Sequence, residues 1–224
     1  MEMNPADQNQ PPPKPADTHY DYLATYYQNL AQQLLAGEIS AEQFTSEQVK
    51  IHLAMEKRVF QDGLIESFLN NIGFTSFLDR ELELLKRTPH LTGTLMALDI
   101  DHLKRFNDSL GHVEGDKLIK IYAQVIAQNS RESDTKGRLG GDEFAVFLIG
   151  SNVADARAVA ERIRVDIIEE TKRNFPQLSW EQTISIGLTQ VKNEDTVAFL
   201  RQRADNALYE AKKEKNKVVT APLT

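Results

Sequence analysis

Apolar side chains recur at two different spacings along the chain, and the spacing separates helices from strands. From Tyr20 to Leu34 they return every three or four residues, which is the period of an α-helix, and this run ends at Gly37. A second helical run starts at Ser40, where Gln43 completes a capping box. The two runs predict a helical hairpin near the start of the chain.

The remainder of the chain alternates helical and strand-like runs. Val153, Ala160 and Ile167 fall on one helical face, whereas the run from Ile184 to Leu188 has the composition of a strand. This order predicts an α+β palm fold, with a central antiparallel-rich sheet flanked by helices. The predicted helices span residues 65–88, 102–110, 114–129, 152–172 and 196–213, and the predicted strands span 94–100, 136–139, 143–149 and 183–191.

Composition divides the chain into four parts. Residues 1–18 are polar and rich in proline, so we expect a disordered or extended tail. Residues 19–62 form the helical extension, for which a brace on the main domain and a dimerisation element are equally open. The main domain is expected at 63–219, followed by a short tail at 220–224.

Charge and composition exclude several classes of protein. A net charge of −7 and a pI near 5.3 argue against binding to nucleic acid. The absence of cysteine excludes disulfides, zinc–thiolate sites and cysteine nucleophiles. No apolar stretch approaches the roughly 20 residues of a membrane span, and the first residues lack the pattern of a signal peptide. We therefore expect a cytoplasmic protein without a membrane span.

Acidic residues gather at two predicted turns. Asp99 and Asp101 end an apolar strand at a spacing of two, which predicts that both carboxylates lie on one face. Gly140 and Gly141 precede Asp142 and Glu143 in a hairpin, where paired glycines supply positive φ angles and leave the backbone open to a ligand. The acids can hold a divalent cation or accept a proton. A solvated hairpin turn is the ordinary alternative.

Two sequence blocks together carry a family resemblance. The run DIDHLKRFNDSLGHVEGD at residues 99–116, followed by RLGGDEF at 138–144, resembles the GGDEF family of diguanylate cyclases. The resemblance covers residues 65–219. It implies a nucleotidyl cyclase-like palm that joins two GTP molecules into cyclic di-GMP and releases two pyrophosphates. It also implies catalysis by Mg²⁺, or by Mn²⁺ in its place, in a homodimer, because each domain holds one GTP.

The resemblance assigns the metal ligands to the end of the strand and to the hairpin. They correspond to Asp99, the backbone carbonyl of Ile100, and Asp142. Glu143 is similar to a family residue that assists the 3′-hydroxyl or binds a second metal, and the sequence leaves these two roles open. Phosphoryl transfer suits such a site, since Mg²⁺ takes a few carboxylates and leaves its other positions to water and phosphate.

Further residues match positions that contact the nucleotide in the family. Asn107 and Asp116 correspond to guanine-reading residues, and an amide and a carboxylate suit the donors of guanine. Helix-cap or turn roles are the alternative for both. Lys104 and Lys212 match triphosphate contacts. His112 also follows the family pattern, and packing at a helix start is as good a role for it.

Near the domain end, the basic residue of the family pattern can be aligned with this chain in two ways. The family has Gly-Arg-Asn or Gly-Lys-Asn there, whereas this chain reads KKEKNK from Lys212 to Lys217, without glycine. Either the glycine is deleted and Lys215 takes the phosphate contact, or the register shifts and no basic residue takes it. A solvated helix end that complements the helix dipole is the third interpretation.

A regulatory site is predicted upstream of the hairpin. Arg131 and Asp134 form an RxxD tetrapeptide separated from Gly140 by five residues, which is the spacing of the family's product-inhibition site. A guanidinium can fork onto phosphate or guanine, and a carboxylate can accept from guanine. We expect cyclic di-GMP to bind here. An exposed i, i+3 ion pair is the alternative.

The chain departs from the family at the start of the domain. The stretch from Asp62 to Asn71 lacks the threonine, glycine and arginine of the usual Asp-x-Leu-Thr-Gly-Leu-x-Asn-Arg pattern, which puts the coupling to an upstream regulator in doubt. A non-catalytic receptor for cyclic di-GMP is the rival function, although Asp99, Asp142 and Glu143 are all present. An enzyme that makes a mixed cyclic dinucleotide is disfavoured by the acid at Asp116.

Overall fold

A computed structural model describes residues 32–40, 42–44, 46, 59–88 and 90–222. The chain divides into two compact units, Met1–Met55 and Glu56–Thr224. In the first unit, a helical turn ends at Gly37, whose φ is 72°. The Ser40 amide donates to Gln43 Oε1 over 2.8 Å and the Gln43 amide donates to Ser40 Oγ over 3.2 Å, which confirms the capping box. The rest of the predicted hairpin and the proline-rich tail lie outside the described residues.

The second unit is built on a five-stranded sheet with the order β2-β3-β1-β4-β5. β1 lies antiparallel to both β3 and β4, β2 lies antiparallel to β3, and β5 lies parallel to β4. The α+β class and the antiparallel-rich sheet are thus confirmed. The strands are β1 (Gly93–Ile100), β2 (Thr135–Arg138), β3 (Glu143–Ile149), β4 (Ile184–Gln190) and β5 (Val218–Thr220).

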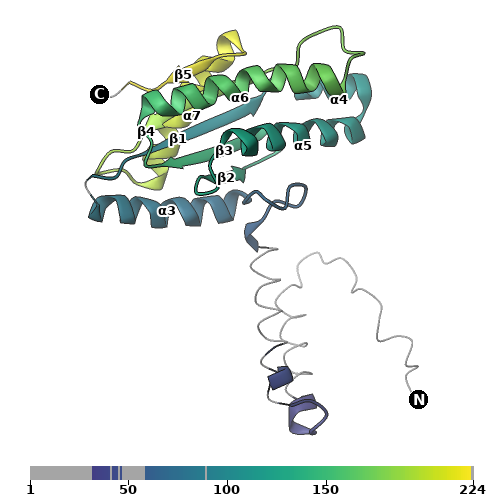
Figure 1. Cartoon of the computed structure of the whole chain (residues 1–224), viewed down its shortest axis with the longest axis vertical. Coiled ribbons are helices and arrows are strands. Elements are labelled where there is room, and N and C mark those ends of the chain that lie inside the picture. Colours follow the sequence, from purple (N-terminus) through teal and green to yellow (C-terminus); the bar gives the residue numbers. More distant parts are fainter. Residues whose placement is uncertain (1–31, 41, 45, 47–58, 89, 223–224) are drawn as a thin grey trace. The chain divides into compact units, whose positions relative to one another are not determined.

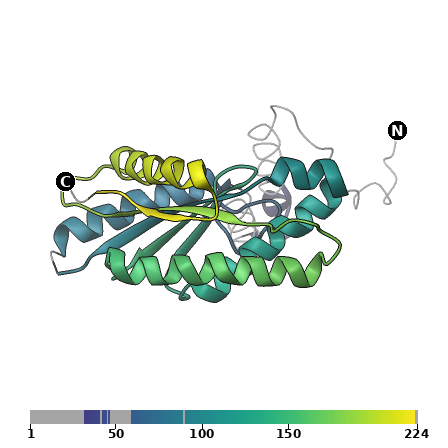
Figure 2. The same ribbon diagram turned by 90° about the horizontal axis from the view of Figure 1, so that it is seen from above.

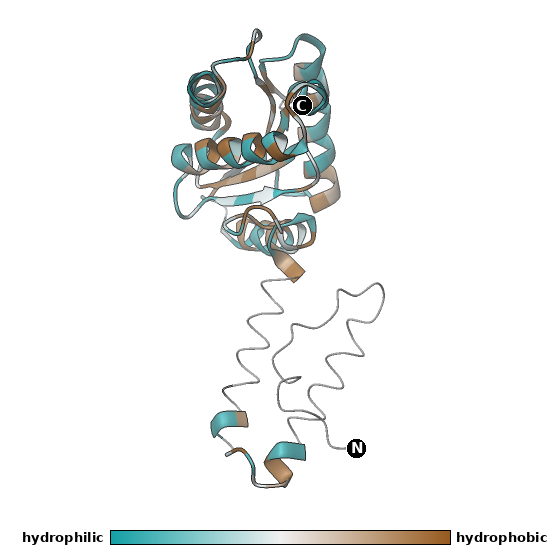
Figure 3. Ribbon diagram, turned by 90° about the vertical axis from the view of Figure 1, so that its right-hand side faces the viewer, coloured by the Kyte–Doolittle hydropathy of each residue, from teal (hydrophilic) through white to brown (hydrophobic). Residues whose placement is uncertain are grey.

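Helices cover both faces of this sheet (Figures 1 and 2). One apolar cluster joins the sheet to α4, α5 and α6, and a second cluster joins its other face to α3 and α7. Figure 3 shows the helices striped, with hydrophobic and hydrophilic sides, as expected for helices that bury one face. The helices are α3 (Asn71–Arg87), α4 (Leu103–Leu110), α5 (His112–Asn129), α6 (Val153–Asn174) and α7 (Val197–Glu214).

β1 is the central strand, and all eight of its residues are buried. Met96 and Leu98 belong to one apolar cluster, whereas Leu95 and Ala97 belong to the other. Alternate side chains of a strand point to opposite faces, so a strand covered on both sides is a continuous apolar run. The end of β1, which carries Asp99, is therefore packed on both faces.

The start of α3 differs from the predicted helix at 65–88. Asp62 Oδ1 accepts the amides of Leu64 and Ile65, both over 2.9 Å, and these bonds form a turn rather than a helix. The helix begins at Asn71, after Asn70, whose Oδ1 caps the Gly73 amide over 2.9 Å. β5 was also absent from the prediction, because three residues carry too little periodicity to mark a strand.

Candidate active site at the ends of β1 and β3

Strand register brings the predicted metal ligands together. Asp99 in β1 is the direct partner of Glu143, the first residue of β3. The Ile100 amide donates to the carbonyl of Asp142 over 3.1 Å, which ties the hairpin turn to the end of β1. Asp99 is 3% exposed, Asp142 is half-buried and Glu143 is exposed. A buried acid thus lies beside two acids that reach solvent.

Lys212 reaches this site from the last turn of α7. Its Nζ lies 2.5 Å from Asp99 Oδ2. The helix approaches the sheet closely because of Gly187 in β4, where a Cβ atom would lie 2.3 Å from the Leu208 amide nitrogen. Glycine at this strand position therefore sets the depth of α7 and, with it, the reach of Lys212.

The electrostatics of the site favour a further cation. Burial raises the pKa of the Asp99 carboxyl to about 6, and the charges of Asp142 and Glu143 raise it while Lys212 opposes them. Burial lowers the pKa of Lys212, but its hydrogen bond to Asp99 and the three negative charges raise it by more, so it lies above the ordinary value. Three carboxylates around one ammonium leave an excess of negative charge.

The oxygen donors fit a magnesium ion that keeps water and phosphate among its ligands. Within the described parts of the chain, no three His, Cys, Asp or Glu side chains converge into a complete metal cage. Asp99, Asp142 and the Ile100 carbonyl are hard oxygen donors at one end of the sheet. Mg²⁺ is usually held by one or two carboxylates together with substrate phosphates, so this partial set suits it.

The two glycines of the hairpin do not have the conformation that the sequence predicted. The glycines with positive φ in the described residues are Gly37, Gly111 and Gly150, and neither Gly140 nor Gly141 is among them. The prediction of positive φ was therefore wrong. A Cβ at Gly141 would meet no atom of the chain within 4 Å. Nothing in the protein itself excludes a side chain there.

Arg138 holds the hairpin turn and was missed by the sequence analysis. Its Nη2 donates to the Gly141 carbonyl over 2.8 Å, and its Nη1 lies 3.3 Å from Asp62 Oδ1. Asp62 belongs to the altered stretch before α3. The link between that stretch and the hairpin is therefore present although the family's threonine, glycine and arginine are not.

Asn107 lies where α4 crosses α5. Its Oδ1 is buried and accepts no hydrogen bond, and it is the sole such side-chain atom of the described residues. A Cβ at Gly115 of α5 would lie 1.8 Å from this oxygen, so α4 and α5 can approach each other this closely only with glycine at position 115. An unpaired buried acceptor costs stability and indicates a missing donor. Asn107 is inside its helix rather than a cap.

The other predicted nucleotide contacts lie on the same two helices or at the end of α7. Lys104 is exposed in the first turn of α4, while His112 and Asp116 are exposed in the first turns of α5. Asp116 is not the cap of α5, because Gly111 occupies that position. Lys215 Nζ lies 3.0 Å from Nε2 of His102, the residue before α4. The lysine side chain therefore points toward the start of α4.

Asp101 does not join Asp99 as the acid spacing predicted. Asp99 contacts Lys212, whereas the carboxylate of Asp101 accepts from the hydroxyls of Thr183 and Ser185 over 2.7 and 2.8 Å. β1 ends at Ile100, so the strand alternation stops before Asp101. Its partners Thr183 and Ser185 are distant in the sequence, so no local pattern predicts the direction of the Asp101 side chain.

Arg131 and Asp134 border a hollow of about 470 Å³ between the end of α5, the loop that follows it, the end of β3 and α6. They do not form the surface ion pair of the alternative interpretation. Asp134 is 5% exposed, and its Oδ2 accepts the Arg131 backbone amide over 2.8 Å. Arg131 is an exposed residue. Arg162 of α6 lines the same hollow and was missed, because its place in the sequence, on a charged helix, carries no motif signal.

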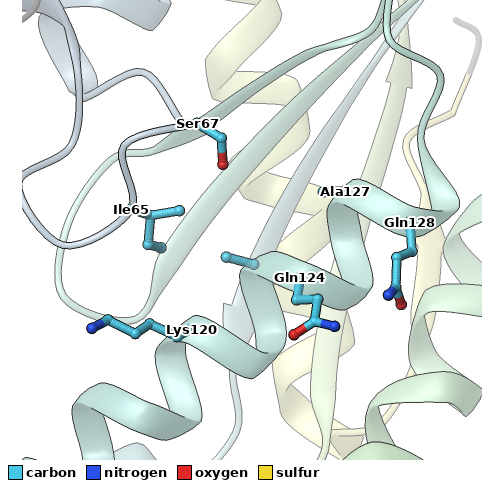
Figure 4. A pocket seen from close by; sticks show the side chains of 7 residues that line it. Ile65, Ser67, Lys120, Gln124, Ala127 and Gln128 are labelled. Carbon is cyan, nitrogen blue, oxygen red and sulfur yellow. The ribbon is translucent and has the colours of Figure 1, made fainter.

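A second hollow, of about 450 Å³, lies between the loop before α3 and the outer side of α5 (Figure 4). Ile65 and Ser67 of the loop face Lys120 and Gln124 of the helix. None of the predicted site residues lines it. In the described part of the chain, no helix has both the length and the apolar character needed to cross a bilayer.

The chain matches known proteins over this unit and beyond. The model of the family "Diguanylate cyclase, GGDEF domain" matches residues 62–217. The probable diguanylate cyclase DgcT of Escherichia coli is 33% identical over 171 residues, which cover 75% of this chain and 37% of DgcT. The chain thus corresponds to little more than a third of that relative's length.

Two solved structures are similar. The coiled coil and GGDEF domain of DgcB from Caulobacter crescentus, in complex with c-di-GMP, covers 84% of this chain and 100% of its own, with 29% identity and a TM-score of 0.74. Diguanylate cyclase SiaD of Pseudomonas aeruginosa, in complex with its activator SiaC, covers 92% of this chain and 78% of its own, with 27% identity and a TM-score of 0.66. From the family match and the fold together, the chain belongs to the GGDEF-domain family of diguanylate cyclases.

Proposed function

We propose that this protein is a diguanylate cyclase that condenses two GTP molecules into cyclic di-GMP and two pyrophosphates. The observation that carries the proposal is the register that places Asp99 opposite Glu143, with Asp142 and Lys212 beside them. Oxygen donors for a divalent ion and a cation for phosphate then share one end of the sheet. GTP and Mg²⁺ belong to the cytoplasm, where we place the domain.

Asn107 and Asp116 would bind the guanine base. The unpaired Oδ1 of Asn107 would accept a donor of the base, which removes the cost of the buried acceptor. Asp116 would accept from the guanine donors that adenine lacks. The bare backbone at Gly140 and Gly141 would admit the phosphates, while Lys104, Lys212 and Lys215 would carry positive charge toward the triphosphate. His112 begins α5 beside this region.

When bound at Asp99, Asp142 and the Ile100 carbonyl, Mg²⁺ would lower the pKa of the attacking hydroxyl and offset charge on the triphosphate. Each 3′-hydroxyl loses its proton and forms a bond to the α-phosphorus of the other nucleotide, while the bond to the β-phosphate breaks and pyrophosphate leaves. Glu143 would accept that proton or complete a second metal site. Since one domain holds one GTP, two domains must face each other, at least transiently.

Cyclic di-GMP would also bind as an inhibitor in the hollow of Arg131 and Asp134. The guanidinium groups of Arg131 and Arg162 border the space, and both can form paired hydrogen bonds to phosphate or guanine. Bound product would link domains in an orientation that separates their GTP sites.

The segment before the domain would relay an input. SiaD covers 92% of this chain, more than residues 62–217 of the family match, so the likeness extends into that segment. We propose that this segment brings two domains together or receives a protein activator. Comparing the sedimentation and turnover of the full chain with those of residues 56–224 would test it.

The decisive experiment is incubation of the purified protein with GTP and Mg²⁺, followed by identification of the nucleotide products by mass spectrometry. We expect the wild type to form cyclic di-GMP and Glu143→Gln to abolish this product. Tight binding of cyclic di-GMP without any product would instead favour a receptor. A mixed product from GTP and ATP would overturn the guanine assignment.

A further inference from the structure

Asp101 is a buried acid that the proposed reaction does not use. It is 3% exposed and forms no ion pair with a described residue. Its Oδ1 accepts from Ser185 Oγ over 2.8 Å, and its Oδ2 accepts from Thr183 Oγ1 over 2.7 Å and from the Asn216 amide over 3.0 Å. Burying a carboxylate is costly unless donors surround it. Asp101 therefore holds β4 and the turn after α7 against the end of β1.

That turn has an unusual backbone. Lys215 and Asn216 have φ angles of 61° and 47°, so two consecutive residues other than glycine lie in the left-handed region. L-residues rarely adopt this conformation, and tertiary contacts must hold it in place. Two hydrogen bonds hold Asn216: its backbone amide donates to Asp101 Oδ2, and its side-chain Oδ1 accepts from Arg164 Nη1 over 2.9 Å.

The turn determines where the Lys215 side chain lies. Its Nζ is 3.0 Å from His102 Nε2, at the start of α4, the helix that carries Lys104. The stretch from Lys212 to Lys217 contains no glycine, although glycine adopts left-handed angles without strain. Asparagine tolerates positive φ better than lysine, so Lys215 is the residue whose conformation the local sequence does not favour. The hydrogen bond from the Asn216 backbone amide to Asp101 thus stabilises a turn that lacks the usual glycine.

We propose that Asp101 is a positioning residue for nucleotide binding. It holds the left-handed turn and so keeps Lys215 beside the first turn of α4, where the ammonium can reach a triphosphate. The proposal rests on the proposed function, because it takes Lys215 as a phosphate contact. Both oxygens of Asp101 already accept donors from the protein, so it acts through Lys215 and not as a metal ligand.

A double-mutant cycle tests this coupling through the dissociation constant of a non-hydrolysable GTP analogue at saturating Mg²⁺. Asp101→Asn replaces one acceptor oxygen by a donor and should weaken binding about tenfold. Lys215→Ala should weaken it by a similar factor. Once Lys215 is gone, adding Asp101→Asn should weaken binding at most about twofold further. The Mg²⁺ concentration for half-maximal analogue binding should stay unchanged in Asp101→Asn.

Lys213→Ala is the matched control, because Lys213 is a neighbouring exposed lysine that pairs with Glu210. It removes the same charge and should leave the dissociation constant unchanged. If Asp101→Asn does not fold, Thr183→Val removes one donor to Asp101 without changing side-chain size and should weaken binding severalfold, whereas Thr183→Ser keeps the hydroxyl and should weaken it less.

Multiplicative effects of Asp101→Asn and Lys215→Ala would overturn the proposal, as would unchanged binding in Asp101→Asn or in Lys215→Ala. A raised Mg²⁺ requirement in Asp101→Asn would make Asp101 a metal ligand instead. A wild-type protein that binds the analogue but makes no cyclic di-GMP would refute the proposed catalysis and leave the positioning role standing.

Discussion

Asp99 and Glu143 are direct partners across β1 and β3, although 43 positions separate them in the chain. The pairing puts a buried carboxylate next to an exposed one, with Asp142 in the adjoining turn. Burial raises the pKa of the Asp99 carboxyl to about 6, while Glu143 is open to solvent at the same end of the sheet.

Removal of the exposed acid should abolish turnover without unfolding the protein. Glu143→Gln is expected to lower the rate of cyclic di-GMP formation at least about 100-fold, because a base or metal ligand is lost. Asp142→Asn should do the same. Both side chains reach solvent, so thermal melting should be unchanged. Undiminished turnover with either variant would remove that residue from the mechanism.

Asp116 should determine the choice of base. Asp116→Ser is expected to reduce the preference for GTP over ATP about tenfold or more, since guanine donors lose their acceptor. Competition between the two nucleotides in one reaction measures this preference. Asp108→Ser, a change to another exposed acid nearby on α4, is the control. An unchanged preference in Asp116→Ser would place guanine recognition elsewhere.

Feedback should depend on both arginines of the hollow between α5 and α6. Arg131→Ala and Arg162→Ala should each weaken cyclic di-GMP binding about tenfold or more, as a charge-assisted contact is lost. Calorimetry without substrate measures the affinity. The initial rate should stay close to that of the wild type, while turnover should stall at a higher product level. Product binding that survives both changes would refute the inhibitory site.

A methyl group at Gly141 should leave the fold intact but weaken GTP binding. Gly141→Ala adds a Cβ that meets no protein atom within 4 Å and needs no unusual φ, so stability should change by about 0.5 kcal/mol or less. GTP binding should weaken if phosphates approach the backbone there. Gly63→Ala, whose Cβ also meets no atom, controls for glycine removal. Normal affinity in Gly141→Ala would leave this glycine without a ligand-based reason.

Stabilisation by Mg²⁺ should depend on pH through Asp99. The pKa of Asp99 in the folded state is raised from 3.8 to about 6. Protonated Asp99 therefore stabilises the metal-free protein, and this contribution is fully present below pH 3.8. This contribution is lost as pH rises through about 6. Mg²⁺ needs the ionised carboxylate, so it should raise the melting temperature more above about pH 7 than below about pH 5.5. Equal shifts at both pH values, or an undiminished shift in Asp99→Asn, would contradict this.

The chain's local patterns determined much of the fold. Helix and strand spacing predicted four of the five strands and placed most boundaries within a few residues, because core-facing side chains repeat with the period of their element. The Ser40–Gln43 capping box was also readable, since both partners lie within one turn. Likewise, the motifs around Asp99 and Asp142 named the residues that the sheet brings together.

Tertiary structure alone decided the features whose partners are distant in sequence. β5 exists because β4 offers an edge to pair with, and Asp101 turns toward Thr183 and Asn216 instead of toward Asp99. The left-handed turn at Lys215 runs against local preference, and Arg162 lines the same hollow as Arg131 only because α6 packs on α5. Periodicity reports which face of an element is buried, whereas a contact between distant residues depends on how the elements pack against each other.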